Sequence, residues 1–165
     1  MTLLQDNKRP SLGAPGVLLA TWFGVGYLPK IPGTWGSAAA LPFAWGILAY
    51  SGVAGLLIAA GVVFALGIWA SNDYMARSGV NDPGPVVIDE VAGQWLVLAV
   101  VPLDWVWFVV GFVLFRLFDI AKPWPVNVMD RCIKGGFGVM IDDIGAAIYA
   151  AASVYGLLLA FETFG

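Results

Sequence analysis

The sequence contains no histidine, one cysteine and little charge, and each scarcity excludes a class of protein. Without histidine, the commonest metal ligand and general base is missing. A single cysteine cannot form an internal disulfide. The net charge of −3 leaves no basic excess for binding a nucleic-acid backbone. What is abundant is apolar: 60% of the 165 residues are hydrophobic and 12% are charged, about half the charge of a soluble domain, so we expect an integral membrane protein.

Long stretches without charge predict the membrane helices. The 42 residues between Lys30 and Asp73 carry no charge, which is enough for two helices of about 20 residues each. The turn-prone cluster Tyr50–Gly52 marks the expected break between them. Three further apolar stretches follow: Val91–Leu103, Trp105–Phe115 and Ile144–Phe161. The sequence therefore predicts an all-α, polytopic membrane helix bundle with about five membrane helices, of which the third and fourth are short.

The distribution of basic residues predicts the orientation of this bundle. Five crossings place the segments 1–30, 73–90 and 116–143 on one side, and these segments hold all eight lysines and arginines. Short loops rich in Lys and Arg stay in the cytoplasm, so we expect functional loops on the cytoplasmic face of the membrane. Residues 1–17 are predicted to form a cytoplasmic tail and residues 18–165 a single membrane-embedded domain.

Two acidic pairs 53 residues apart, Asp89-Glu90 and Asp142-Asp143, occur in similar contexts. Each follows an apolar triplet and precedes a predicted membrane helix. Such carboxylates can serve as helix caps, but one acid per helix would suffice for that. Adjacent carboxylates at a membrane boundary repel each other, and two such pairs favour a cation site. Oxygen ligands without histidine indicate a hard ion, Mg²⁺ ahead of Ca²⁺ or Mn²⁺.

Arg116, Asp119 and Lys122 are spaced three residues apart and share one face at the end of the fourth predicted helix. Ion pairing and snorkelling at the membrane interface would explain the two basic residues. Asp119, however, lies among apolar neighbours, and a carboxylate in that position is expected to face the bundle interior or a polar cavity. We therefore predict a site role for Asp119.

A Pro-Gly turn before the first membrane helix presents Thr34 and Ser37. Its glycines would let a ligand approach the backbone closely, and the helix N-terminus that follows favours an anion. The other interpretation is a turn whose hydroxyls begin the helix, as in many proteins.

Four motifs together resemble one family. They are PGTWGS at 32–37, IDE at 88–90, FRLFDIAKPWPV at 115–126 and GGFGVMIDDI at 135–144. In this order and spacing they are similar to bacterial phosphatidylglycerophosphatase A, from about Leu18 to Ile148. The resemblance implies a Mg²⁺-dependent inner-membrane enzyme that removes the terminal phosphate of phosphatidylglycerophosphate to give phosphatidylglycerol, in phospholipid biosynthesis. The chain departs from similar sequences at Gly145-Ala146, where Ala-Gly is usual, a small-residue exchange within a helix.

The residues predict how such a reaction would be divided among them. The expected catalytic residues are Asp89, Glu90, Asp119, Asp142 and Asp143. The expected Mg²⁺ ligands are Asp89, Glu90, Asp142 and Asp143. The expected phosphate-binding residues are Thr34, Ser37, Arg116 and Lys122. Asp119 is a candidate base, nucleophile or further ligand, and the sequence leaves open whether water attacks directly or an aspartyl-phosphate forms.

The inventory of residues also bears on competing functions. Cysteine phosphatases need an arginine six positions after the cysteine, but Gly138 occupies that place after Cys132. Histidine-dependent phosphatases and those with an Asp-x-Asp motif are excluded by composition. A small cation transporter or channel subunit could use the same carboxylates, although they collect at one membrane face rather than through the bilayer. A noncatalytic assembly subunit is a second alternative, which activity surviving Asp→Asn changes would favour.

Overall fold

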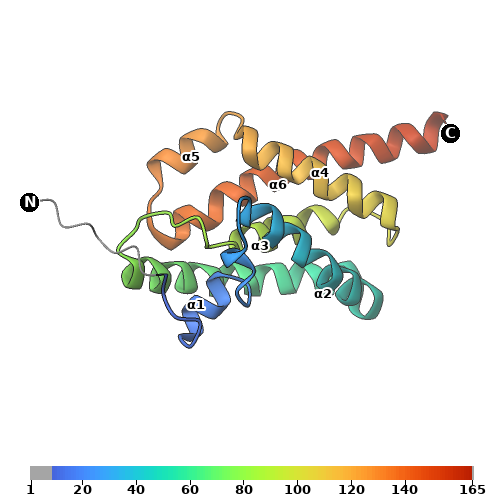
Figure 1. Cartoon of the computed structure of the whole chain (residues 1–165). Coiled ribbons are helices and arrows are strands. Elements are labelled where there is room, and N and C mark those ends of the chain that lie inside the picture. The colour runs from blue at the N-terminus through green and yellow to red at the C-terminus, as the bar shows by residue number, and fades with distance from the viewer. Residues whose placement is uncertain (1–8, 165) are drawn as a thin grey trace, which may run out of the picture.

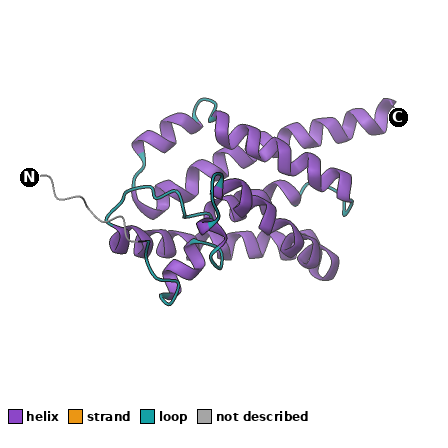
Figure 2. Cartoon of the chain, in the orientation of Figure 1, coloured by secondary structure: helices purple, strands orange, loops and turns teal. Residues whose placement is uncertain are grey.

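The computed structural model describes residues 9–164, which form helices and connecting loops (Figures 1 and 2). In chain order the elements are α1 (Pro15–Ala20), η1 (Val25–Tyr27), α2 (Pro32–Ser78), α3 (Ile88–Leu98), α4 (Trp105–Ala121), α5 (Val126–Cys132) and α6 (Gly135–Phe164). Within the described range no strand is present, so the predicted all-α class is confirmed.

Helix α2 is a hairpin of two arms rather than one rod. Gly52 within it has φ 65° and ψ −168°, a conformation outside the helical region. Figure 1 shows the chain reversing its direction along α2, so the two arms run antiparallel. The predicted break at Tyr50–Gly52 is confirmed, and its cause is a glycine in a region of φ and ψ that side chains disfavour.

The two arms of α2, then α3, α4 and α6, alternate in direction along the bundle (Figure 1). Helix α3 has 11 residues and α4 has 17, compared with 30 in α6. Asp104 begins α4, because its side chain accepts hydrogen bonds from the backbone N–H groups of Val106 and Trp107. The alternation brings the start of α3, the end of α4 and the start of α6 toward the same end of the bundle.

Two helices, α2 and α6, are long and apolar enough to cross a membrane by length and composition. The larger set of five membrane helices and their cytoplasmic orientation stay predictions. The domain division after residue 17 also stays a prediction, and residues 1–8 of the expected tail lie outside the described residues.

Helix α3 lies at the centre and packs against α2, α4 and α6. Its side chains Val91, Val97 and Leu98 are fully buried. Gly93 lets α3 approach its neighbours closely, since a Cβ there would meet the ring of Phe115 and the backbone of α6. This central position holds the acidic first turn of α3 against both α4 and α6.

The sequence predicts that the motifs lie in functional loops. This prediction is wrong for three of the four motifs, because they lie within helices. Helix α2 begins at Pro32, α3 at Ile88 and α6 at Gly135, so each motif forms the first turns of a helix. For α6 the reason is a tertiary cap: Asn72 Oδ1 accepts a hydrogen bond of 2.8 Å from the Gly136 N–H. Because Asn72, 64 residues earlier in the chain, caps the helix, α6 begins upstream of its apolar stretch.

Candidate active site

The first acidic pair lies in the opening turn of α3. Asp89 and Glu90 are the acidic residues of that turn, where the helix dipole favours negative charge. Val87, which precedes the helix, offers no side-chain cap. Its backbone N–H is instead bonded to the Ala20 carbonyl at 2.8 Å, which ties the start of α3 to the end of α1. A backbone hydrogen bond to the end of α1, rather than a side-chain cap, therefore holds the acidic pair in place.

The second acidic pair lies further along α6, beyond its second turn. Asp142 and Asp143 are buried, with 6% and 3% of their surface exposed. Burial of a carboxylate is costly unless an ion or a hydrogen bond compensates it, so each of these side chains needs a partner. The two residues find different ones, because successive residues of a helix face different directions.

Asp143 joins the first pair. One carboxylate oxygen from each of Asp89, Glu90 and Asp143 lies within 4.8 Å of the other two. Asp89 Oδ1, Glu90 Oε2 and Asp143 Oδ2 are buried and have no hydrogen-bond partner among the described residues. Three mutually repelling carboxylates with unpartnered oxygens fit a hard divalent cation, which prefers oxygen ligands. The residues present therefore suit the predicted metal, without identifying the ion.

Asp142 instead faces Lys122. The Lys122 ammonium donates to Asp142 Oδ2 at 2.6 Å and to Asp130 Oδ1 at 2.7 Å. These contacts bring together the end of α4, helix α5 and helix α6. Asp142 Oδ1 keeps no partner in the described part of the chain, so one of its oxygens is free for a ligand.

The Lys122 contacts shift two ionisation equilibria outside the apolar helices. Burial alone would lower the pKa of Lys122, but its hydrogen bonds to Asp130 and Asp142 raise that pKa above the ordinary value. The hydrogen bond from Lys122 likewise lowers the pKa of Asp130. Both groups are therefore charged across the neutral range, and the contact between Lys122 at the end of α4 and Asp130 on α5 is an ion pair.

Arg116 organises the other side of the cluster. Its guanidinium lies 2.7 Å from Asp119 Oδ2 and 3.7 Å from Glu90 Oε1, and it donates to the Ser37 hydroxyl at 3.4 Å. Gly33 lies directly against this group, since a Cβ there would meet Glu90 Oε1 and Arg116 Nη2. Arg116 thus links the starts of α2 and α3 to the end of α4.

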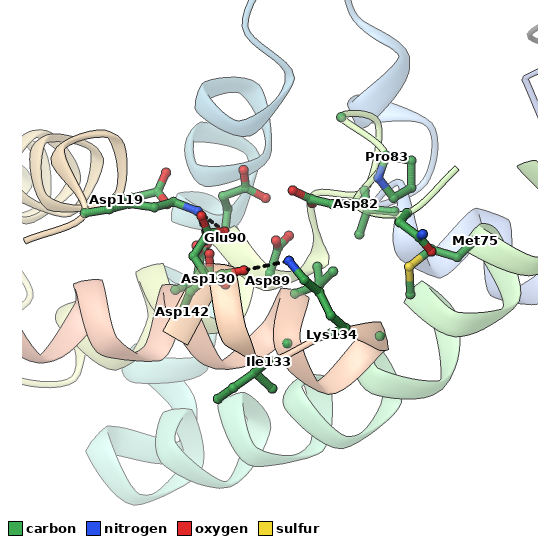
Figure 3. A pocket seen from close by; sticks show the side chains of 18 of the residues that line it. Met75, Asp82, Pro83, Asp89, Glu90, Asp119, Asp130, Ile133, Lys134 and Asp142 are labelled. Atoms are coloured by element: carbon green, nitrogen blue, oxygen red, sulfur yellow. Dashed lines mark hydrogen bonds and ion pairs between the residues drawn. The ribbon is translucent and has the colours of Figure 1, made fainter. Parts of the chain in front are cut away.

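A cavity of about 630 Å³ opens beside these groups (Figure 3). Seven carboxylates and two lysines line it, in addition to smaller and apolar residues. The carboxylates are Asp82, Asp89, Glu90, Asp119, Asp130, Asp142 and Asp143, and the lysines are Lys122 and Lys134. A phosphate would be repelled by this excess of negative charge unless a bound cation offset it. Thr34, Ser37 and Arg116 are not among the lining residues.

Comparison with known proteins identifies the family of the chain. The family model for phosphatidylglycerophosphatase A matches residues 18–158. The chain belongs to that family. It is 43% identical over 158 residues to phosphatidylglycerophosphatase A of Haemophilus influenzae, covering 95% of this chain and 97% of the relative. Its identity to phosphatidylglycerophosphatase A of Escherichia coli is 39% over 163 residues, with 94% and 93% covered.

A third relative has a different name. A Bacteroides thetaiotaomicron protein, provisionally named a phosphatidylinositol-3-phosphatase, is 42% identical over 151 residues, which cover 87% of this chain and 92% of that protein. No solved structure matches the chain significantly. Membership of the phosphatidylglycerophosphatase A family makes the chain a phosphoric monoester hydrolase, as the sequence resemblance implied.

Three charged cavity residues are not among the site residues that the sequence predicts: Asp82, Asp130 and Lys134. Asp130 lies on α5 and Lys134 just before α6, within the part of the chain that the phosphatidylglycerophosphatase A model matches. The charge pattern of Asp130 to Lys134 resembles that of an ordinary exposed face. A signal that could have found them is the shortness of the segment between two site motifs, which forces α5 to lie near the cluster.

Proposed function

We propose that this chain hydrolyses the terminal phosphate of phosphatidylglycerophosphate, using Mg²⁺, to give phosphatidylglycerol and inorganic phosphate. One observation carries the proposal: unpartnered carboxylate oxygens of Asp89, Glu90 and Asp143 gather beside a cavity in a chain of the phosphatidylglycerophosphatase A family. The names of two relatives, each aligned over more than nine tenths of both chains, give the substrate.

Asp89, Glu90 and Asp143 would hold the Mg²⁺, with the free oxygen of Asp142 as a fourth ligand. When bound, Mg²⁺ offsets negative charge on the phosphate oxygens as a Lewis acid. The acidic lining of the cavity supports this assignment, because a phosphate dianion needs a cation to enter it.

The chain's own basic residues position the carboxylates. Arg116 holds Glu90 and Asp119 through its guanidinium, and Ser37 accepts a hydrogen bond from that guanidinium. Lys122 lines the cavity and holds Asp142. We assign Arg116 and Ser37 to positioning and Lys122 to both positioning and phosphate binding. A direct phosphate contact by Thr34 stays a sequence-based prediction.

Asp119 is the carboxylate that we propose acts on the attacking group. It lines the cavity, and its ion pair with Arg116 fixes the orientation of its carboxylate. As a base it would take the proton of the attacking water. As a nucleophile it would form an aspartyl-phosphate, which trapping of labelled phosphate on the protein would reveal. Inversion at phosphorus in a single step would exclude the covalent route.

The membrane provides the remaining part of the proposal. With the arms of α2, α4 and α6 crossing the bilayer and the shorter α3 enclosed among them, the cavity would lie at the cytoplasmic boundary, where basic residues of the chain collect. The acyl chains of the substrate would stay in the leaflet while its head group enters the cavity. This arrangement is the multi-pass, cytoplasm-facing topology that the charge distribution predicts.

Phosphate release from phosphatidylglycerophosphate by the detergent-purified protein tests the proposal. We expect release to need Mg²⁺ and to fall by at least about 100-fold in Asp143→Asn, as for loss of a group that stabilises the transition state. Glu162→Gln is a matched control, because Glu162 is an exposed carboxylate of the same helix. Release that persists in Asp143→Asn, or that ignores Mg²⁺, would contradict the proposed site. No release from folded wild-type protein would return the carboxylates to the cation-transport interpretation.

A further inference from the structure

One basic side chain at the cavity has no carboxylate partner. Lys122 is held between Asp130 and Asp142, and Arg116 is paired with Asp119 and does not line the cavity. Lys134 lines the cavity, and no carboxylate of the described residues lies within 4.0 Å of its ammonium. Its recorded contact is a 3.4 Å hydrogen bond to the Asp130 backbone carbonyl. The charge of Lys134 is therefore available to an anion.

Lys134 and the carboxylate cluster lie at different depths of the same cavity. The side chain of Lys134 is exposed, whereas Asp143 is 3% exposed. Figure 3 shows the Lys134 side chain directed from the base of α6 into the cavity, on the side of Asp130. Asp89 and Glu90 are half-buried, so exposure increases from Asp143 to Lys134, which suits an inner anion next to the proposed metal ligands and an outer anion next to Lys134.

The proposed substrate has two phosphates that match these positions. Its terminal phosphate is a monoester, and its second phosphate is a diester that joins the head group to the acylated glycerol. If the monoester lies at the carboxylate cluster, the diester lies nearer to the acyl chains and the cavity mouth. Ile120 and Ile133 also line the cavity, and Ile120 is 71% exposed, so the mouth offers apolar surface to the lipid.

We infer that Lys134 binds the phosphodiester of the substrate and thereby selects lipids in which a diester precedes the cleaved monoester. This inference rests on the proposed function, since it assumes a phosphomonoester at the inner position. A lysine suits the role because its ammonium is a compact charge on a flexible stem and can follow a phosphate at the edge of a cavity. Lys134 is then a specificity residue, distinct from the carboxylates that carry the reaction.

The test uses two ligands that separate the positions. A short-chain phosphatidylglycerol in neutral detergent carries the diester alone, and inorganic phosphate represents the monoester. We expect Lys134→Gln to raise the Kd of phosphatidylglycerol about tenfold, equivalent to about 1.4 kcal/mol, and to leave the Kd of inorganic phosphate, measured with Mg²⁺, within about twofold. Titration calorimetry measures both constants without turnover.

Two further variants complete the design. Lys134→Arg keeps the charge and should bind phosphatidylglycerol within about threefold of wild type, since most of the interaction is charge-assisted. Arg131→Gln is the matched control, because Arg131 is an exposed basic residue of α5 that does not line the cavity.

The outcomes separate this inference from the proposed function. An unchanged Kd of phosphatidylglycerol in Lys134→Gln, or an equal weakening of both ligands, would overturn the role of Lys134. Failure of wild-type protein to release phosphate from phosphatidylglycerophosphate would instead overturn the proposed function, whatever the binding experiment gives.

Discussion

At the scale of single residues, the site requires a glycine at position 33. Gly33 lies where α2 passes Glu90 and Arg116, and a Cβ at this position would meet both of their side chains. Any larger residue must displace the side chain of Glu90 or of Arg116. Arg116 is also the partner of Asp119, so its displacement would move that carboxylate as well.

We predict that Gly33→Ala lowers kcat/KM by about 100-fold, because displacing a catalytic group by about 1 Å has effects of that size. The measurement is Mg²⁺-dependent phosphate release by the purified variant. Gly46→Ala is the matched control on the same helix, since a Cβ at Gly46 would meet nothing within 4 Å. If Gly33→Ala is as active as Gly46→Ala, the close packing around Glu90 has no catalytic role.

The ion pair of Lys122 with Asp130 gives a pH-dependent prediction. The pKa of Asp130 is lowered, so its contribution to stability is complete above the unfolded pKa of about 3.9 and is lost as pH falls through the folded value. The pKa of Lys122 is raised, so its contribution is complete below about pH 10.4 and is lost as pH rises through the folded value. Between pH 5 and 9 the pair should therefore contribute a constant amount.

Asp130→Asn should lower the free energy of unfolding by about 1 kcal/mol or less, because the Asp130 side chain is 35% exposed and solvent screens the pair. Melting temperatures in detergent at pH 6, 7.5 and 9 should show the same difference from wild type, and the difference should shrink below about pH 4. Asp82→Asn is the control, since no ion pair of Asp82 is recorded within the described residues. A difference that vanishes at pH 9 would contradict the assignment.

Residue types could be predicted from the sequence better than their partners. The paired acids stood out because adjacent carboxylates beside apolar stretches are costly without a function. Their division could not be foreseen: Asp143 joins Asp89 and Glu90, whereas Asp142 faces Lys122. That difference arises from the rotation between successive helical residues and from the position of α5, and neither is encoded in local spacing.

At the scale of elements, hydropathy located the long helices and the start of α4 at Trp105, but it missed the short helices α1 and α5 and the starts of α3 and α6. The apolar stretch of the last helix was expected from Ile144, while α6 begins at Gly135. Charge ends an apolar stretch, but it does not end a helix whose carboxylates are buried and whose first N–H groups are satisfied. In α6, the Asn72 side chain accepts a hydrogen bond from one of these groups, the N–H of Gly136. This contact links distant parts of the chain, so local sequence does not predict it.

The hairpin in α2 gives a prediction for an element. Gly52 has φ 65° and ψ −168°, a region that residues with a Cβ enter at a cost of about 1–3 kcal/mol. Gly52→Ala should therefore lower the melting temperature by about 2–10 °C. Gly61→Ala, in the second arm, should leave it unchanged or raise it slightly, since its Cβ would meet nothing within 4 Å and alanine favours helix. Equal melting temperatures for the two variants would contradict a reversal fixed by Gly52.

At the scale of the whole molecule, the alternating helices place the site at one end. The proposed function, in which phosphate is released at the cytoplasmic face, requires that end to face the cytoplasm. The single cysteine, Cys132, is exposed on α5 at this end and provides a natural reporter. Leu103, between α3 and α4, is exposed toward the opposite end of the bundle.

A membrane-impermeant maleimide should label Cys132 in inside-out vesicles and leave it unlabelled in intact spheroplasts. In a protein carrying Cys132→Ser and Leu103→Cys, the pattern should reverse. Labelling is read by mass shift on the purified protein. Labelling of Cys132 from outside the cell would invert the proposed topology.

The shortness of α4 affects the lipid as well as the protein. Its 17 residues extend about 25 Å, less than a bilayer core about 30 Å thick, and its side chains Val109, Val113 and Leu117 are exposed on the outside of the bundle. A protein that is short on one side pulls the surrounding leaflet inward, because lipids adjust to hydrophobic mismatch. The substrate's head group would then meet the cavity by local thinning of the bilayer rather than by being lifted out of it. The enzyme's rate would accordingly depend on acyl-chain length in the host membrane, fastest in thin bilayers and slower in thick, ordered ones.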